Sequence, residues 1–67
     1  MKYQVELVVC EKDMTWHYER YTVELDDVWN ERVGEFDFEN EVKGKAIDQR
    51  PATPTAFIGL SFYDEAE

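Results

Sequence analysis

The stretch Thr15–Leu25, TWHYERYTVEL, decides the fold. Its aromatic and β-branched residues fit a pleated, half-buried surface and predict a strand. Alternate residues of a strand point to opposite faces. Trp16 and Tyr18 fall on one face, whereas Tyr21 falls on the other. Because both faces carry aromatic side chains, we expect a central strand that is covered, at least in part, on both sides.

Another strand is predicted before it, at residues 2–10. Its core face alternates with the remaining positions and consists of Tyr3, Val5, Leu7 and Val9. A polar break at residues 11–14 separates the two strands. An antiparallel hairpin is the simplest connection across so short a break. We expect the core face of residues 2–10 to share one core with a face of Thr15–Leu25.

The last predicted strand covers residues 56–63, AFIGLSFY, and is almost continuously apolar. It follows a loop at residues 50–55. A residue before proline avoids the helical region, so a helix before Pro51 must end by Gln49. A continuous apolar run indicates burial on both faces, or one face against the core and the other against a partner. Gly59 allows another backbone to approach closely.

The segment between these strands is less regular. We expect a short helix at residues 27–33, an extended or irregular piece at 35–38 and a helix at 39–49. Pairs such as Glu39–Lys43 favour the second helix. The alternative is an extra strand near 34–42, where Phe36 and Phe38 alternate with acids, followed by a turn at Lys43-Gly44. The predicted fold class is α+β, a small antiparallel sheet with helical segments, and the alternative is a small all-β sheet.

The length of 67 residues predicts a single domain over residues 1–67, with residues 64–67 as a flexible acidic tail. The lone cysteine, Cys10, excludes an intramolecular disulfide and fits a reducing compartment. The first ten residues do not read as a signal peptide, because Glu6 interrupts the apolar run. No stretch approaches the roughly 20 apolar residues that span a bilayer. We expect a cytoplasmic protein with no membrane partner.

The charge of the chain is strongly negative and unevenly distributed. The net charge is −9, from 16 acidic and 7 basic residues. Residues 24–41 hold most of the excess, with Arg32 as their one basic residue, and residues 64–67 add more acids. Such a field repels nucleic acid and anionic membranes and attracts basic surfaces. We expect a basic protein partner and no direct binding of nucleic acid; the alternative is that the acids only keep the protein soluble.

The predicted partner-binding residues are acids that we expect to form one exposed negative surface. They are Asp26, Asp27, Glu31, Glu35, Asp37, Glu39, Glu41, Asp64 and Glu65. Like charges so close in sequence repel one another and cost stability. A partner that supplies lysine or arginine side chains relieves this repulsion, so partner binding would explain why the chain keeps these acids close together.

We expect no metal, cofactor or enzymatic activity. Cys10 and His17 are the only soft ligands, too few for a structural zinc site. The alternate acids of residues 35–39 lack the central glycine of an EF-hand loop. A Cys10–His17 dyad beside the hairpin turn has no third orienting group, and so small a domain offers no deep pocket.

The aromatic residues make up 15% of the chain and are expected mostly in the core. So small an interior does not bury them all, and aromatic residues that remain on the surface beside acids form a contact patch.

Two functional hypotheses follow. The first is a small acidic protein-binding module, an inhibitor that presents carboxylates where phosphates sit in a nucleic-acid-handling partner. Small acidic inhibitors of this kind are common among viral and mobile-element proteins, which is an analogy of class only. The second is a self-associating structural or regulatory module, a homodimer that uses the apolar last strand either by edge pairing or by packing face to face.

Overall fold

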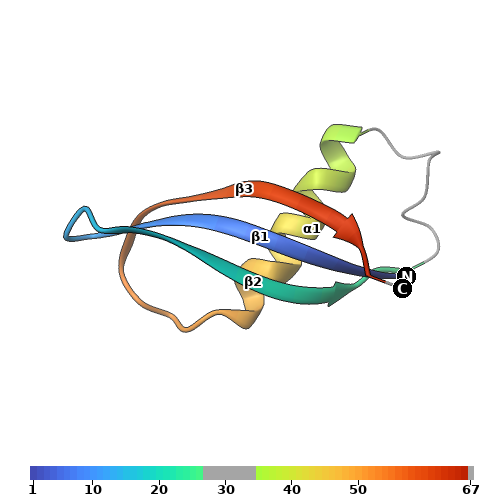
Figure 1. Ribbon diagram of the computed structural model, residues 1–67, viewed down its shortest axis with the longest axis horizontal. Helices are drawn as coiled ribbons and strands as arrows, with labels where there is room; N and C mark the ends of the chain where they lie inside the picture. The colour runs from blue at the N-terminus through green and yellow to red at the C-terminus, as the bar shows by residue number, and fades with distance from the viewer. Residues whose placement is uncertain (27–34, 67) are drawn as a thin grey trace.

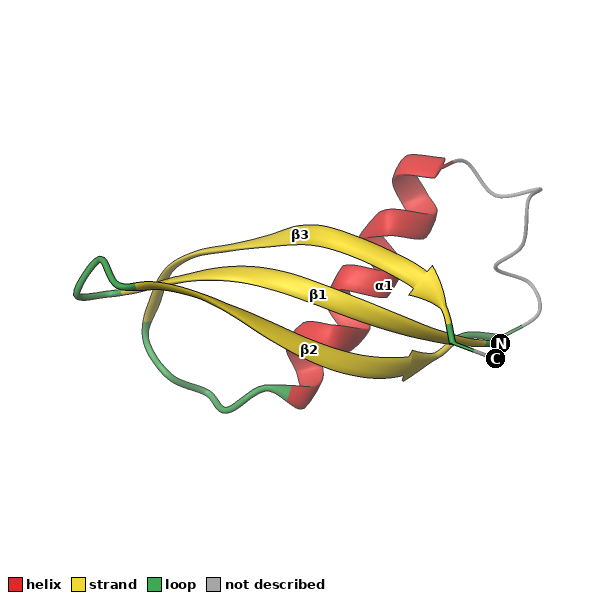
Figure 2. Ribbon diagram, in the orientation of Figure 1, coloured by secondary structure: helices red, strands yellow, loops and turns green. Residues whose placement is uncertain are grey.

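The computed structural model describes residues 1–26 and 35–66 of the chain. The elements in chain order are β1 (Lys2–Glu11), β2 (Trp16–Glu24), α1 (Glu35–Gln49) and β3 (Thr55–Glu65). The strands form one antiparallel sheet in the order β2-β1-β3, and α1 crosses behind it (Figures 1 and 2). The predicted α+β class, the hairpin and the final strand are therefore confirmed.

β1 is the central strand and supplies the middle of the core. Val5, Leu7 and Val9 are fully buried, as the alternation of the sequence predicts. The neighbouring elements complete the core with Val23, Leu25, Val42 and Ala46. The predicted shared core of β1 and residues 15–25 is thus confirmed.

The prediction that residues 15–25 form the central strand is wrong. β3 pairs with the other side of β1, so β2 lies at an edge of the sheet. β2 carries aromatic residues on both faces for different reasons. Tyr21 packs against the core, whereas Trp16 and Tyr18 are exposed on the other face. Strand order depends on where β3 returns after α1, and the local pattern of β2 carries no information about that return.

The hairpin turn between β1 and β2 is held by backbone hydrogen bonds. The amide of Met14 donates to the Glu11 carbonyl at 2.9 Å, and the amide of Glu11 donates to the Thr15 carbonyl at 2.9 Å. The amide of Thr15 also donates to Asp13 Oδ1 at 3.0 Å. Met14 has a φ of 69°, the left-handed conformation that closes a three-residue hairpin loop.

α1 is a continuous helix from residue 35 to residue 49. The predicted helix at 39–49 is confirmed, whereas the extended piece at 35–38 is wrong, as is the alternative strand over residues 35–42. The ring of Phe38 explains the difference. Its centroid lies 5.3 Å from that of Tyr3 and 5.5 Å from that of Tyr63, a tertiary contact that the local alternation does not reveal. The predicted helix at 27–33 lies outside the described residues.

The middle and the end of α1 also bear on the predictions. Gly44 lies inside the helix, where a Cβ would meet no atom within 4 Å, so the predicted alternative turn at Lys43-Gly44 is wrong. The helix ends at Gln49, as predicted from Pro51. No helix among residues 1–26 and 35–66 is long and apolar enough to cross a membrane.

β3 departs from regular pairing at two places, where Ala56 and Ser61 have no partner on β1. Extra residues of this kind are bulges, which bend and twist a strand. β3 ends with Asp64 and Glu65. These two residues were predicted to belong to a flexible tail.

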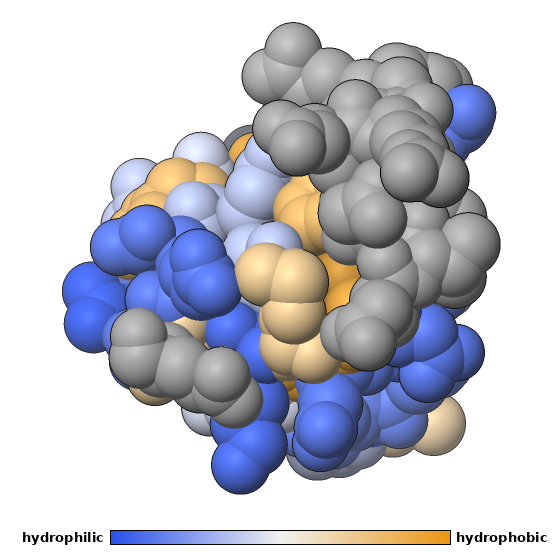
Figure 3. Space-filling model, turned by 90° about the vertical axis from the view of Figure 1, so that its right-hand side faces the viewer, coloured by the Kyte–Doolittle hydropathy of each residue, from blue (hydrophilic) through white to orange (hydrophobic). Residues whose placement is uncertain are grey.

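Both ends of the chain lie together at one end of the sheet (Figure 1). The Met1 ammonium group donates to the Leu25 carbonyl at 2.8 Å, and the amide of Ala66 donates to the Lys2 carbonyl at 2.9 Å. At this end of the molecule, hydrophilic residues lie to the left of and below a small strip of apolar ones in the view of Figure 3.

Candidate functional site

The sheet face directed away from α1 is called the open face. The register places the following residues on it: Lys2, Gln4, Glu6, Val8, Cys10, Trp16, Tyr18, Arg20, Thr22, Glu24, Phe57, Gly59, Ser61, Phe62 and Asp64. Figure 1 looks onto this face, and α1 lies behind the strands. The opposite face, which α1 packs against, is called the covered face.

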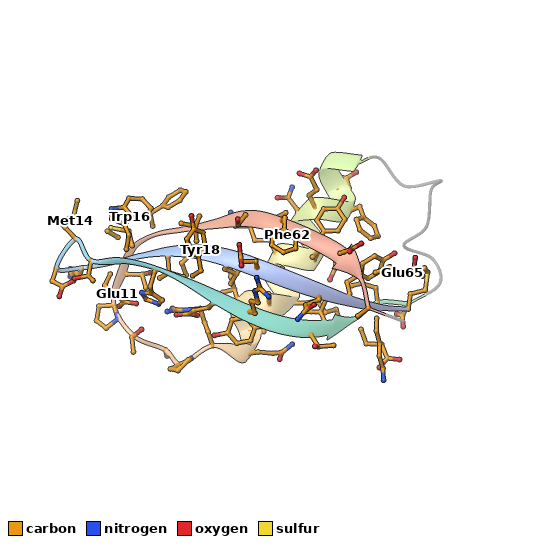
Figure 4. The ribbon with its side chains drawn as sticks, viewed as in Figure 1. Glu11, Met14, Trp16, Tyr18, Phe62 and Glu65 are labelled. Atoms are coloured by element: carbon orange, nitrogen blue, oxygen red, sulfur yellow. The ribbon has the colours of Figure 1, made fainter. Side chains whose placement is uncertain are left out.

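Four aromatic side chains of the open face are largely exposed. The exposed fraction is 67% for Tyr18, 57% for Trp16, 51% for Phe57 and 45% for Phe62. Trp16, Tyr18 and Phe62 are spread along the strands from the hairpin end to the middle of the sheet (Figure 4). Grouped exposed aromatic residues mark interaction surfaces on soluble proteins, so this group is the strongest candidate for a functional site.

The aromatic row nearest the hairpin covers the one cysteine. Cys10 lies on β1 opposite Trp16 on one side and Phe57 on the other. The rings of Trp16 and Phe57 are 6.0 Å apart between centroids, and Cys10 is buried. The thiol is therefore shielded by the two rings and behaves as a small apolar residue of the open face.

Gly59 determines where the ring of Phe57 lies. A Cβ on Gly59 would stand 2.8 Å from Phe57 Cε2 and Cζ, and 3.3 Å from Val8 Cγ1. The ring thus occupies the space that a side chain would need. The sequence predicts that another backbone approaches Gly59, whereas the structure places an aromatic side chain there.

The next row combines a charge pair with an aromatic ring. Arg20 Nε donates to Glu6 Oε1 at 3.0 Å, and the Ser61 hydroxyl donates to Glu6 Oε2 at 3.1 Å. The Arg20 guanidinium also lies 5.9 Å from the centroid of Phe62, within the range of a cation–π contact. Glu6 and Arg20 neutralise each other in the middle of the open face.

The open face as a whole is nearly neutral. Its two basic residues, Lys2 and Arg20, stand against three acids, Glu6, Glu24 and Asp64, which gives a net charge of −1. The whole chain carries −9. The negative charge is therefore concentrated elsewhere on the molecule.

A second polar group lies on the covered face beside the end of α1. Arg50 Nε donates to Glu19 Oε1 at 2.9 Å and Arg50 Nη2 donates to Glu19 Oε2 at 3.1 Å. Arg50 Nη2 also lies 3.4 Å from Glu11 Oε1. The Tyr21 hydroxyl donates to Glu19 Oε1 at 2.6 Å, and His17 Nε2 lies 2.6 Å from Glu19 Oε2.

This polar group is electrostatically satisfied. The bidentate hydrogen bonds from Arg50, assisted by those from Tyr21 and His17, lower the pKa of Glu19 to about 2. The Arg50 side chain is only 6% exposed. Arg50 thus links the segment after α1 to β2, and the role of this polar group is structural.

The same group bears on the predicted absence of a metal. Glu11, His17 and Glu19 bring potential ligand atoms within 4.8 Å of one another. The guanidinium of Arg50 already supplies the positive charge that these carboxylates need. A metal ion would have to displace this buried cation, which disfavours a metal site here.

The Cys10–His17 dyad considered from the sequence is not formed. His17 pairs with Val9 and belongs to the covered face, whereas Cys10 pairs with Trp16 and belongs to the open face. Neighbouring positions along a strand point to opposite sides of the sheet. The sheet itself therefore separates the two side chains.

The structure distributes the predicted acidic residues over several elements. Asp26 follows β2 and is exposed, and Asp37, Glu39 and Glu41 lie on α1, with Asp37 exposed and the other two half-buried. Glu35 begins α1, while Asp27 and Glu31 lie outside the described residues.

The two C-terminal acids are separated by the sheet. Asp64 pairs with Gln4 on the open face and Glu65 pairs with Tyr3 on the covered face. Both are exposed. Of the predicted set, the structure places Asp37 and Glu41 one turn apart on the same side of α1, whereas Glu39, two residues from each, lies on another side of the helix.

The sequence predicts a contact patch of exposed aromatic residues, but it does not predict which residues form it or that they share the open face. Trp16, Tyr18 and Arg20 share one parity with Thr22 and Glu24, a mixed pattern that is typical of a solvent-accessible face. The contribution of Phe57 and Phe62 was not visible, because the bulges at Ala56 and Ser61 change the parity of β3. Arg50 was also missed, because nothing local links a loop arginine to Glu19.

Comparisons with protein-family models, with curated proteins and with solved structures give no match to this chain.

Proposed function

We propose that this protein is a small protein-binding module that docks on a basic surface of a partner through the acidic residues of α1. One observation carries the proposal. Glu6, Glu11 and Glu19 are held in ion pairs with two arginines of the chain itself, Arg20 and Arg50. Asp37, Glu39 and Glu41 take part in none of the ion pairs among the described residues. These three carboxylates of α1 are therefore available to cations of a partner.

The placement of these acids suits long-range attraction. They lie in the first half of α1, and the helix dipole favours the negative charge of Asp37, which is in the first turn. A field of one sign raises the rate at which an oppositely charged partner associates. Asp26, Asp64 and Glu65 are further exposed acids of the predicted set.

The partner class that fits best is a protein that handles nucleic acid. Such proteins carry clustered lysine and arginine residues that normally meet phosphates. Carboxylates spaced along a helix offer these cations an alternative anion. In this proposal the protein inhibits its partner by occupying the nucleic-acid site, so an oligonucleotide should compete with it.

A peptide array tests the proposal. The probes are peptides that vary in the number and spacing of lysine and arginine, each paired with a version that carries glutamine at those positions. The triple variant Asp37→Asn, Glu39→Gln, Glu41→Gln removes the helix charge without changing side-chain length. The matched control removes the same charge from exposed acids away from the first half of α1, through Asp13→Asn in the hairpin turn, Glu24→Gln on β2 and Asp48→Asn in the last turn of α1.

We expect the wild type to bind the basic peptides and not the glutamine versions. The helix variant should lose about tenfold or more in affinity, and the control should lose much less, because only exposed charges near the contact are felt over the ~8–10 Å screening distance. Circular dichroism checks that both variants fold. Equal losses in the two variants, or binding that ignores salt, would show that the helix acids serve only solubility.

A further inference from the structure

We propose that a second copy of this chain covers the open face, so that two sheets pack face to face in a homodimer with the helices outside. This inference goes beyond the proposed function, because it uses the opposite side of the molecule. It also selects between the two modes of self-association that the sequence suggests, the edge and the face. Four features of the open face lead to it.

The first feature is the choice of aromatic residues. Phe57, Phe62 and Trp16 are about half exposed or more. Tyr3 and Tyr63, which carry a hydroxyl group that water can solvate, are partly buried on the covered face. A face meant for water would carry the tyrosines outward and the phenylalanines inward. Tyr18 and Phe38 follow that rule, whereas Phe57, Phe62 and Trp16 depart from it. Three apolar rings left about half exposed are expected of a face that is covered in the functional state.

The second feature is charge. The open face carries only −1 of the net −9, and its central charges, Glu6 and Arg20, are already paired at 3.0 Å. Two such faces can approach without bringing the acids of α1 together. In a two-fold interface each residue meets its counterpart surface, so Arg20 of one copy can share Glu6 of the other. A basic partner would find few free carboxylates on the open face, because Glu6 is already paired with Arg20.

The third feature is size. The molecule measures 39 by 21 Å across the view of Figure 1, which looks onto the open face. That footprint is of the order of the ~800 Å² that each partner buries in a stable interface. The exposed aromatic residues occupy the hairpin half of this area, and polar residues such as Gln4 and Thr22 occupy the other half. The aromatic half would supply the apolar part of such an interface and the other half its polar part.

The fourth feature is the condition of the sheet edges. β3 carries bulges at Ala56 and Ser61, which disturb the regular ladder that a symmetry-related strand would need. On the other edge, the Gln49 amide donates to the Thr22 carbonyl of β2 at 2.8 Å. Edge pairing is therefore hindered on both sides. The open face is the surface that remains for a second copy.

Sedimentation equilibrium of the intact chain tests the proposal. The mass is measured from about 10 μM to about 1 mM at physiological salt. The test variant is Tyr18→Lys, which places a charge at the most exposed aromatic position. The matched control is Asn40→Lys, which makes the same change of charge at an exposed position of α1. Phe57→Lys is a second test variant on the other edge of the same face.

We expect the wild type and Asn40→Lys to move from 8.0 kDa toward twice that mass, and both test variants to dimerise at least ~100-fold more weakly. Adding a positive charge to so acidic a chain weakens repulsion between copies, so general electrostatics alone would strengthen association in all three variants. A wild type that stays monomeric to millimolar concentration overturns the proposal. A dimer that survives both Tyr18→Lys and Phe57→Lys also overturns it, because its interface is then an edge or the helix. The Asp37, Glu39 and Glu41 variant described above should dimerise normally, so failure of either proposal leaves the other intact.

Discussion

The two faces of the sheet are built from the same strands and from the same kinds of residue, and they differ in what covers them. On the covered face, Tyr3 and Tyr63 contact the ring of Phe38 from α1. On the open face, the rings of Trp16 and Phe57 contact each other, and each residue remains about half exposed. The same alternation in β1 serves both faces. The comparison shows that a strand pattern predicts which residues share a face, but not whether that face is covered.

The largest expected difference between the faces concerns two neighbouring residues of β1. Leu7 is fully buried on the covered face, and Val8 is half-buried on the open face. Leu7→Ala should reduce the free energy of unfolding by about 2–5 kcal/mol, the usual cost of a large-to-small change in a core. Val8→Ala should cost about 1 kcal/mol or less. Urea unfolding at low protein concentration, where the monomer dominates, measures both.

The outcome for Leu7 also tests the assignment of the core. A loss under about 0.5 kcal/mol would mean that Leu7 is not in it. Equal losses for Leu7 and Val8 would mean that the open face is covered in the monomer.

The covered face could be predicted from the sequence because its signals are local. The alternation in β1 places Val5, Leu7 and Val9 on one side, and the short polar break before Thr15 implies the hairpin. The order of the strands could not be predicted in this way. β3 pairs with β1 because α1 delivers it to that side of the sheet, and this return depends on contacts between residues far apart in sequence.

The helix and the candidate site show the same limit. The alternation of Phe36 and Phe38 with acids favours a strand locally, but Phe38 finds Tyr3 and Tyr63 only from a helix. The sequence shows that the acids cluster along the chain, but it does not show that Asp64 and Glu65 lie on opposite faces of the sheet. The exposed aromatic group draws on β2 and β3 together, so it exists only once the sheet has formed.

A smaller difference between the two faces is the pH dependence of the stability that the covered face contributes. The pKa of Glu19 is lowered from 4.5 to about 2, chiefly by the hydrogen bonds from Arg50. A folded-state pKa below the unfolded value contributes stability that is present above the unfolded pKa and is lost as the pH falls toward the folded one. We expect this contribution, about 1–3 kcal/mol, to disappear between about pH 5 and pH 2.

Glu19→Gln removes that contribution from the covered face. Its unfolding free energy should fall less steeply between pH 5 and pH 2 than that of the wild type, and the control Asp48→Asn, at an exposed position of α1, should follow the wild type. The measurement is chemical unfolding at each pH. If Glu19→Gln and the wild type show parallel pH profiles, the tie between Glu19 and Arg50 does not form in solution.

The smallest effects come from two glycines on opposite sides of the sheet, and they should differ in sign. Gly44 lies within α1 with no atom within 4 Å of a Cβ, whereas a Cβ on Gly59 would stand 2.8 Å from the ring of Phe57. Gly44→Ala should stabilise the protein by about 1 kcal/mol, since alanine favours the helix. Gly59→Ala should destabilise it by about 1 kcal/mol, because the ring must move.

The two glycine variants should also differ in self-association. Displacing the ring of Phe57 disturbs the open face, so Gly59→Ala should weaken the dimer in sedimentation equilibrium, whereas Gly44→Ala should leave it unchanged. The destabilisation is small because the ring is the flexible end of a side chain, so the effect on the dimer is separable from the effect on folding. If Gly59→Ala stabilises the protein as Gly44→Ala does, the ring of Phe57 does not lie on Gly59, and the open face is less ordered than its register with β1 implies.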